Sequence, residues 1–124
     1  MMRSISVFEE AKMSSVFDLL DEIRKRPPMY VGYDESKRAM QLKVLEILMD
    51  GYSMALRNHN IQERVSDFNR EFAEYLFETK GWSASCGPVV AILEAAKNEE
   101  EGWALFWRMV DEFRSTVEKH RDPL

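Results

Sequence analysis

The 124-residue chain is poor in the residues that form covalent or metal cross-links. It has one cysteine, Cys86, and two histidines, His59 and His120. A single cysteine cannot form an intrachain disulfide, which favours a reducing compartment. Each histidine lies at the end of a different predicted helix, where a surface position is expected. No HExxH, CxxC or paired Glu-x-x-His spacing occurs, so we expect neither a metal site nor a cofactor.

Long apolar runs and clustered basic residues are also lacking. No stretch of about 18 uncharged apolar residues occurs, so no membrane span is expected. The N-terminus carries Arg3, Glu9 and Glu10 and lacks the apolar run of a signal peptide. The predicted location is therefore the cytoplasm. The net charge of −5 argues against general nucleic-acid affinity, which depends on clustered lysine and arginine.

Helical periodicity, in contrast, is abundant, above all in residues 37–58. Between Ala39 and Leu56, 12 of 18 residues are apolar. One narrow stripe at helical spacing is polar: Lys43, Glu46, Asp50, Ser53 and Arg57. A helix that is apolar over most of its circumference must be covered on several sides. We therefore predict that residues 37–58 form the central helix of the domain.

Four further helices are predicted around this central helix. The first begins at Ser14 or Ser15 and stops at Pro27 and Pro28, because proline cannot continue a helix. Residues 29–32 are expected to be extended. The other three run from about Ile61 to Lys80 with Gly81 as C-cap, from Gly87-Pro88 to Asn98, and from Glu99 to about Lys119. The prediction is an all-α, single-domain bundle of about five helices over residues 13–124, with residues 1–12 as an N-terminal extension.

Few residues suggest catalysis. Glu46 and Asp50 are four residues apart on one helix, so their carboxylates could face each other and do acid–base work. On the polar stripe of a buried helix, pairing with Lys43 or Arg57 is the simpler expectation. Cys86 matches no nucleophile signature and is expected to be a small buried side chain.

Residues 24–32, RKRPPMYVG, resemble the segment RKRPxMYxG near the start of the ATPase domain of gyrase B and its relatives. The resemblance implies a glutamate general base at Glu46 and a magnesium-binding asparagine at position 50, where this chain has Asp50. No Asp-Gly-x-Gly loop occurs, the five glycines stand alone, and no strands are predicted for the sheet of that fold. Phosphates would lack a cradle of backbone amides, so we expect no ATPase.

The same segment has a structural interpretation. Pro27 and Pro28 restrict the unfolded loop. Met29 and Tyr30 are expected to fold back under the central helix, and Gly32 to adopt a positive φ. Arg26 is expected to bond the last carbonyls of its own helix. On this interpretation the motif shapes the fold.

A wider resemblance extends from Met13 to about Phe113. It is carried by SSxFDLLxxIRKRPxMYxG at the start, Gly51-Tyr52, Gly81-Trp82, and a last helix with Trp103, Phe106-Trp107 and Asp111-Glu112-Phe113. This pattern is similar to a family of small bacterial cytoplasmic proteins that includes immunity proteins of polymorphic-toxin and contact-dependent inhibition systems. The resemblance implies a binding protein without catalytic activity that occludes the active site of one toxin domain.

An acidic immunity protein suits a basic toxin such as a nuclease, because complementary charge speeds association. The predicted contact residues are the acidic side chains Glu94, Glu99, Glu100 and Glu101, with Tyr33 and Trp82 as aromatic anchors. The alternative for the glutamates is helix capping, and for Trp82 it is to plug the end of the bundle.

Two other functions stay open. A small enzyme or ligand-binding module would place a site near Glu46, Asp50 and Tyr52, in a closed polar pocket with shifted carboxylate pKa values. A structural homodimer would have a two-fold interface centred on Trp103 and Trp107.

Overall fold

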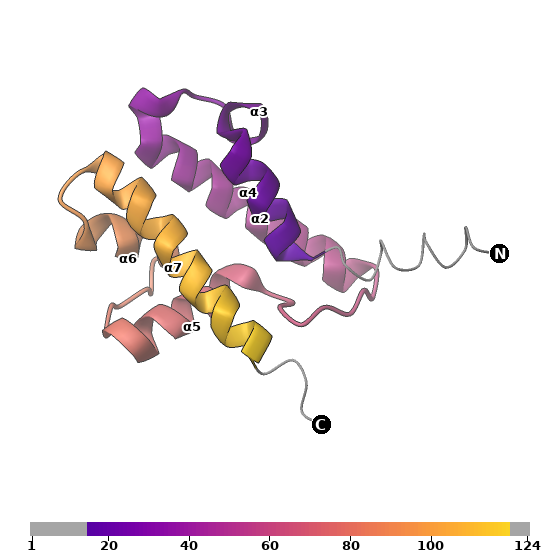
Figure 1. Cartoon of the computed structure of the whole chain (residues 1–124). Coiled ribbons are helices and arrows are strands. Elements are labelled where there is room, and N and C mark those ends of the chain that lie inside the picture. Colours follow the sequence, from indigo (N-terminus) through magenta and orange to yellow (C-terminus); the bar gives the residue numbers. More distant parts are fainter. Residues whose placement is uncertain (1–14, 120–124) are drawn as a thin grey trace.

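The computed structural model describes residues 15–119, and every regular element within that range is helical (Figure 1). The elements are α2 (Val16–Lys25), α3 (Pro27–Val31), the 3-10 turn η1 (Glu35–Lys37), α4 (Arg38–Asn58), α5 (Phe68–Lys80), α6 (Pro88–Ala95) and α7 (Glu99–Lys119). The all-α prediction is confirmed, and residues 15–119 alone contain six α-helices where five were expected. The predictions for residues 1–12, Met13, Ser14 and His120 fall outside the described residues.

The first described helix, α2, has the ends that its sequence predicts. The Ser15 side chain caps it by accepting a hydrogen bond from the Phe17 N–H at 3.2 Å, which satisfies one otherwise unpaired amide. Arg24 and Lys25 lie in the last turn, at the negative end of the helix dipole. Two ion pairs of 3.0 Å, Arg24–Asp111 and Arg114–Asp21, join α2 to α7.

The segment expected to be extended is the short helix α3, so that prediction is wrong. Its two prolines occupy the first turn, where the missing amide costs nothing. Gly32 ends the helix with φ 68°, as expected. Met29 does not fold under the central helix: it is 67% exposed, and Tyr30 is also exposed, whereas Val31 is buried. At helical rather than extended spacing, only one of these three side chains can face the core.

The C-terminal end of α2 is capped by a backbone hydrogen bond. The N–H of Arg26 donates to the carbonyl of Glu22, whereas the sequence interpretation assigned carbonyl capping to the Arg26 side chain.

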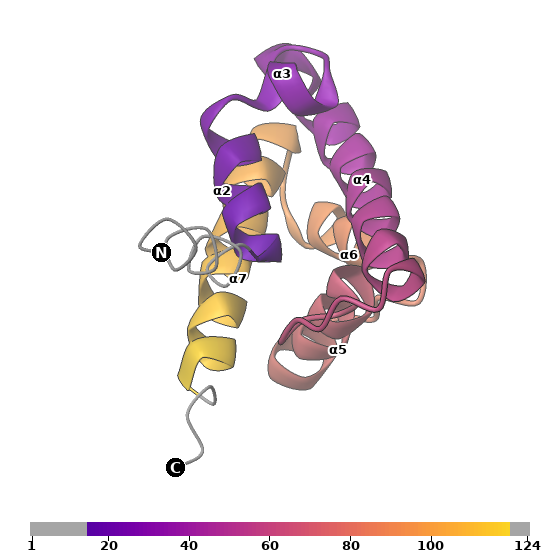
Figure 2. The ribbon, with the colours of Figure 1, turned by 90° about the vertical axis from the view of Figure 1, so that its right-hand side faces the viewer.

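The predicted central helix is α4, which packs against α3, α5, α6 and α7 (Figure 2). Its buried apolar residues are Leu42, Leu45, Met49 and Leu56. One residue of the polar stripe, Ser53, is buried, and its Oγ accepts a hydrogen bond from the Phe68 N–H at 3.4 Å. The covering of α4 is incomplete, and one side of the helix faces outward.

The next helix begins later than predicted. Residues 59–67 form a loop, and α5 starts after Asp67, whose side chain accepts from the Arg70 N–H. The Glu71 carboxylate accepts from the amides of Ser66 and Asp67, a reciprocal cap like a capping box but with the glutamate one residue later. Gly81 ends α5 with φ 74°, as predicted.

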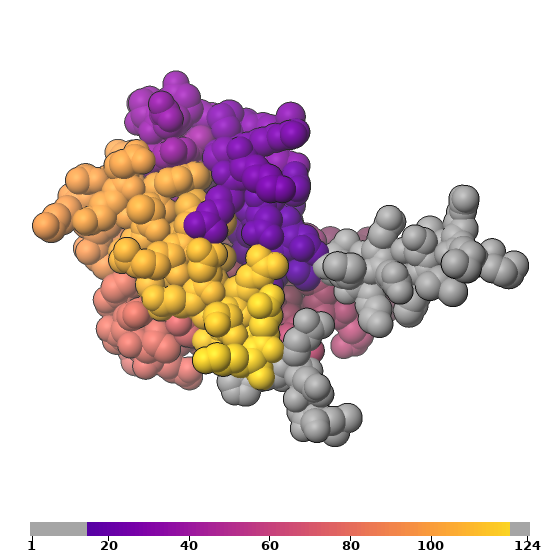
Figure 3. Space-filling model, in the orientation of Figure 1, coloured from indigo at the N-terminus to yellow at the C-terminus, as the bar shows by residue number. Residues whose placement is uncertain are grey.

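The core lies where α4, α5 and α7 meet, and it is rich in aromatic rings. Phe72 packs against Phe68, Phe106 and Phe113 with ring centroids 5.1 to 5.8 Å apart. Such offset and edge contacts add to the stabilisation from burial alone. The filled surface of Figure 3 shows α7 packed between α2 and α5.

Candidate functional site

Exposed apolar side chains gather where α3 leads into α4. Met29, Tyr30 and Tyr33, which we call the α3–α4 turn surface, lie on the chain just before η1, and Tyr33 is 49% exposed. Tyr33 has φ 56°, a left-handed conformation that costs about 1–2 kcal/mol for a residue with a Cβ. The fold thus holds an exposed tyrosine in a strained backbone position.

Gln41, in the first helical turn of α4, holds the turn at Tyr33 in place by side-chain hydrogen bonds. Its side chain is fully buried, and its Nε2 donates to the carbonyls of Gly32 at 3.3 Å and Tyr33 at 3.0 Å. Its Oε1 accepts from Arg38 Nη1 at 2.8 Å, and the Arg38 guanidinium lies 4.1 Å from the ring centre of Trp103. The turn is therefore fixed to α4 and α7.

The Asp34 carboxylate fixes the start of η1. It accepts from the Ser36 N–H at 2.9 Å and from the Ser36 hydroxyl, and these hydrogen bonds lower the pKa of Asp34.

A row of apolar residues follows along α4. Met40, Ile47 and Met54 are 37%, 69% and 52% exposed, and they recur every seven residues. We call them the outer face of α4. Seven residues are close to two helical turns, so the row stays on one side of the helix over about 21 Å. In Figure 2, this helix runs along one edge of the molecule. The sequence prediction counted these residues as core.

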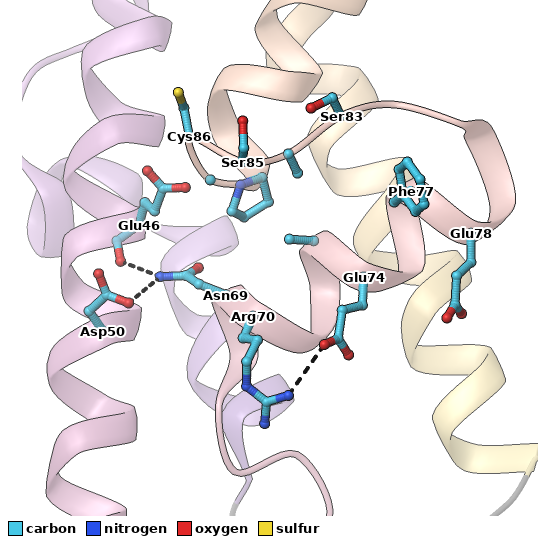
Figure 4. A pocket seen from close by; sticks show the side chains of 14 residues that line it. Glu46, Asp50, Asn69, Arg70, Glu74, Phe77, Glu78, Ser83, Ser85 and Cys86 are labelled. Carbon is cyan, nitrogen blue, oxygen red and sulfur yellow. Dashed lines mark hydrogen bonds and ion pairs between the residues drawn. The ribbon is translucent and has the colours of Figure 1, made fainter.

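A cleft of about 650 Å³ opens beside this face, between α4, α5 and the loop of residues 81–88 (Figure 4). Its lining is Glu46, Asp50, Asn69, Arg70, Ala73, Glu74, Phe77, Glu78, Ser83, Ala84, Ser85, Cys86, Gly87 and Pro88. Cys86 is exposed, so the expectation that it is buried is wrong. The thiol belongs to a surface loop that forms one wall of the cleft.

Glu46 acts here as the cap of another helix. Its Oε2 accepts a hydrogen bond from the Val89 N–H at 3.2 Å, in the first turn of α6. The residue at the N-cap position, Gly87, has no side chain to do this, and a Cβ there would collide with the Glu46 carboxylate. Burial raises the pKa of Glu46, the nearby Asp50 charge adds to the rise, and the Val89 hydrogen bond opposes it.

Asp50 lies one turn further along α4. Asn69 Nδ2 donates to Asp50 Oδ1 and to the Glu46 carbonyl, both at 2.8 Å. The expected pairing of Glu46 or Asp50 with Lys43 or Arg57 is wrong, since among residues 15–119 neither carboxylate has a cationic partner. Arg57 instead lies 4.0 Å from Asp67.

Tyr52, the third residue of the predicted ligand site, does not line the cleft. Its hydroxyl donates to Glu63 Oε2 at 2.5 Å, and burial followed by this hydrogen bond strongly raises the pKa of Tyr52. Glu63 Oε1 also accepts from the Val16 N–H at 3.2 Å. Tyr52 therefore helps to anchor the 59–67 loop to α2 and α4.

The predicted acidic contact residues are largely engaged in the fold. Glu99 Oε1 accepts from the Ala39 N–H at 3.0 Å, Glu100 lies 3.7 Å from Arg38 Nε, and Glu101 accepts from the Lys97 N–H at 2.6 Å. Glu99 and Glu100 thus meet the N-terminal end of α4, which also holds the turn of Tyr33 through Gln41. Of the remaining candidates, Glu94 is exposed on α6 but belongs neither to the cleft nor to the outer face of α4, so it is not one of the proposed contacts. Trp82 is half-buried against the core.

The aromatic residues of α7 are used inside the chain. Trp107 is buried and Trp103 is half-buried beside Arg38. A dimer interface centred on these two residues, as the homodimer hypothesis placed it, would have to use side chains that already belong to the core.

Comparisons with known proteins add no relatives: no family model, no curated protein and no solved structure matches the chain. Within residues 15–119, no group of three or more His, Cys, Asp or Glu side chains is placed to hold a metal ion. None of the helices in that range has the length and apolar composition needed to cross a bilayer.

Proposed function

We propose that this chain is a cytoplasmic binding protein of the immunity type, which neutralises a cognate bacterial toxin domain by covering its active site and has no catalytic activity of its own. One observation carries the proposal. The outer face of α4 presents Met40, Ile47 and Met54 to solvent, in one row on a helix whose opposite side is anchored in the core.

Along this face the exposed residues Lys43 and Asp50 lie between the three apolar side chains, and such a mixture of exposed apolar and charged groups is typical of surfaces that bind protein partners. Methionine and tyrosine are enriched in protein interfaces, and aromatic anchors often dominate their binding energy. The α3–α4 turn surface adds Met29, Tyr30 and Tyr33 next to the start of this helix. Because Gln41 fixes the backbone of Gly32 and Tyr33, a partner would have to order the exposed side chains but not the turn itself, which lowers the entropy cost of binding.

The proposed partner is a basic toxin domain, such as a nuclease. The net charge of −5 gives a negative field that attracts such a domain and speeds its association.

The proposal predicts that a toxin is encoded immediately upstream of this chain's gene, and the test is rescue of cells that express that upstream product. Ile47→Asp should abolish rescue and weaken binding of the purified toxin domain by about tenfold or more, because it places a charge in the middle of the apolar row. Ala104→Asp is the matched control: Ala104 is an exposed residue of α7, away from this face. Both variants should melt close to the parent chain.

A second variant separates binding from folding. Tyr33→Asn suits the left-handed backbone, because asparagine tolerates that conformation, so the free energy of unfolding should not fall. Binding of the toxin domain should weaken. The proposal fails if the upstream product is not bound, or if Ile47→Asp rescues cells as well as Ala104→Asp does.

A further inference from the structure

We infer that the cleft between α4, α5 and the 81–88 loop receives a lysine or arginine side chain of the protein partner. This inference rests on the proposed function and adds to it the point at which the partner's positive charge is recognised. It is carried by the shape of the cleft, by its charge and by its position beside the outer face of α4.

The charges that line the cleft are strongly unbalanced. Four carboxylates, those of Glu46, Asp50, Glu74 and Glu78, face a single cation, Arg70. Arg70 is already engaged, at 3.4 Å from Glu74 and 3.5 Å from Asp67. The cleft therefore holds an excess of negative charge that a basic group would neutralise.

The carboxylates of Glu46 and Asp50 contribute most to this imbalance, Glu46 from a half-buried position and Asp50 from an exposed one. They lie on successive turns of α4, Glu46 is half-buried, and among the described residues no cationic side chain pairs with either of them. Like charges in a partly desolvated place oppose each other's ionisation. Asn69 and Val89 already donate one hydrogen bond each to these two carboxylates, and a cation that reaches their remaining acceptor sites would reduce the repulsion and add charge-assisted hydrogen bonds.

The walls suit the rest of a basic side chain. Ala73, Phe77, Ala84 and Pro88 supply apolar surface, and Phe77 is 61% exposed at the rim. Lysine and arginine lay their aliphatic stems on apolar surface while their charged ends reach polar groups, and either cation can also stack on an aromatic ring. Figure 4 shows Phe77 and Glu78 on one side of the opening and Glu46 on the other.

The cleft is also continuous with the proposed interface. Glu46 and Asp50 flank Ile47 on α4, so a partner seated on the outer face of α4 lies directly beside the opening. A hydrophobic contact with a charged pocket at its edge is the usual arrangement of an interface core and its polar rim.

The inference can be tested without the toxin. The isotope-labelled full chain is titrated with the peptide acetyl-Ala-Arg-Ala-amide, and amide shifts are followed by NMR; acetyl-Ala-Gln-Ala-amide is the uncharged control. We expect saturable shifts at Ala73, Phe77 and residues 83–87 with the arginine peptide only. Asp50→Asn keeps the shape of the side chain and should weaken binding about three- to fivefold, the range of a partly exposed ion pair.

The matched control is Glu94→Gln, which removes one exposed carboxylate outside the cleft and should leave the affinity unchanged. The inference is overturned if both variants bind alike, if the shifts follow exposed carboxylates all over the surface, or if magnesium chloride moves the cleft amides and the arginine peptide does not. None of these outcomes affects the rescue experiment, and a failure of rescue would leave saturable peptide binding intact. The two proposals therefore fail separately.

Discussion

Three polar side chains, Gln41, Glu46 and Glu63, hold backbone segments that are distant from them in the sequence. Gln41 binds the carbonyls of Gly32 and Tyr33, Glu46 binds the first turn of α6, and Glu63 binds the start of α2. All are buried or half-buried. A buried polar group is costly unless it is hydrogen-bonded, so each of these contacts fixes one arrangement of the loops. At the residue scale, the surfaces proposed for binding depend on these three clamps.

The first prediction concerns Gln41. Gln41→Leu keeps the approximate volume but leaves two carbonyls and the Arg38 guanidinium without this partner. The free energy of unfolding should fall by about 1–3 kcal/mol, the cost of unsatisfied buried polar groups. Urea denaturation measures it. The control is Gln62→Leu, an exposed site that should change stability little; equal stability of the two variants would contradict the role given to Gln41.

The second prediction concerns pH and Glu46. Because the pKa of Glu46 is raised above its ordinary value of 4.5, the folded chain holds this proton to higher pH than the unfolded chain. Between 4.5 and the raised pKa the folded state binds more protons, so the stability that Glu46 contributes falls as pH rises through this window. Below 4.5 the contribution is fully present.

Glu46→Gln removes this titration while its side-chain oxygen can still accept from Val89. The stability of the variant relative to the parent chain should therefore be greatest at neutral pH and should shrink as pH falls toward 4.5. Urea denaturation at several pH values checks this, with a carbon NMR titration of the Glu46 carboxyl as the direct reading. A stability difference that grows on acidification would contradict the prediction.

At the element scale, the sequence predicts helices well where their ends carry chemical signals. Ser15 begins α2, Gly81 ends α5, and Gly87-Pro88 begins α6, and each has a conformational reason to do so. The late start of α5 was missed because Ile61 and Val65 continue the helical period. The signal was nevertheless present in Asp67 and Glu71, which form the cap.

Other features could not be predicted from periodicity. A run such as residues 29–31 is too short for its period to distinguish a helical turn from an extended segment. The sequence assigns the outer face of α4 to the core, because apolar composition alone does not show whether another helix packs against that face. The cleft forms because the 81–88 loop packs against α4 although more than thirty residues of sequence separate them, and because Glu46 caps α6 in place of an N-cap side chain at Gly87. Neither contact leaves a local pattern in the sequence.

The third prediction belongs to the loop between α4 and α5. Tyr52→Phe removes the hydroxyl that donates to Glu63, and Glu63→Gln removes the charge that accepts it. Each should lower the free energy of unfolding by about 1 kcal/mol. The double variant should lose less than the sum, because the two groups share one interaction. Additive losses in a double-mutant cycle would show that the 59–67 loop is held in another way.

At the scale of the whole molecule, charge and apolar surface have separate roles. Glu99 and Glu100 at the start of α7 contact the N-terminal end of α4 and support the fold. In the cleft, Glu46, Asp50 and Glu78 have no cationic partner among residues 15–119. The exposed apolar residues extend past both regions, from the turn before α4 to Met54. We therefore propose that the net negative charge attracts a basic partner and that burial of the exposed apolar residues supplies most of the affinity. The carboxylates of the cleft would then fix the orientation of the partner.

The last prediction separates the general field from the local site. Glu78→Lys and Glu94→Lys each reverse one exposed charge, and neither glutamate has a side-chain partner within residues 15–119. Both change the net charge from −5 to −3, so both should slow association with the toxin domain to a similar, small extent. Only Glu78 lines the cleft, so only Glu78→Lys should also speed dissociation, since contact changes act mainly on that rate.

Surface plasmon resonance at 50 and 500 mM sodium chloride measures both rates. High salt should slow association for every variant and leave the faster dissociation of Glu78→Lys in place. Equal dissociation rates for the two variants would mean that charge attracts the partner without being recognised in the cleft.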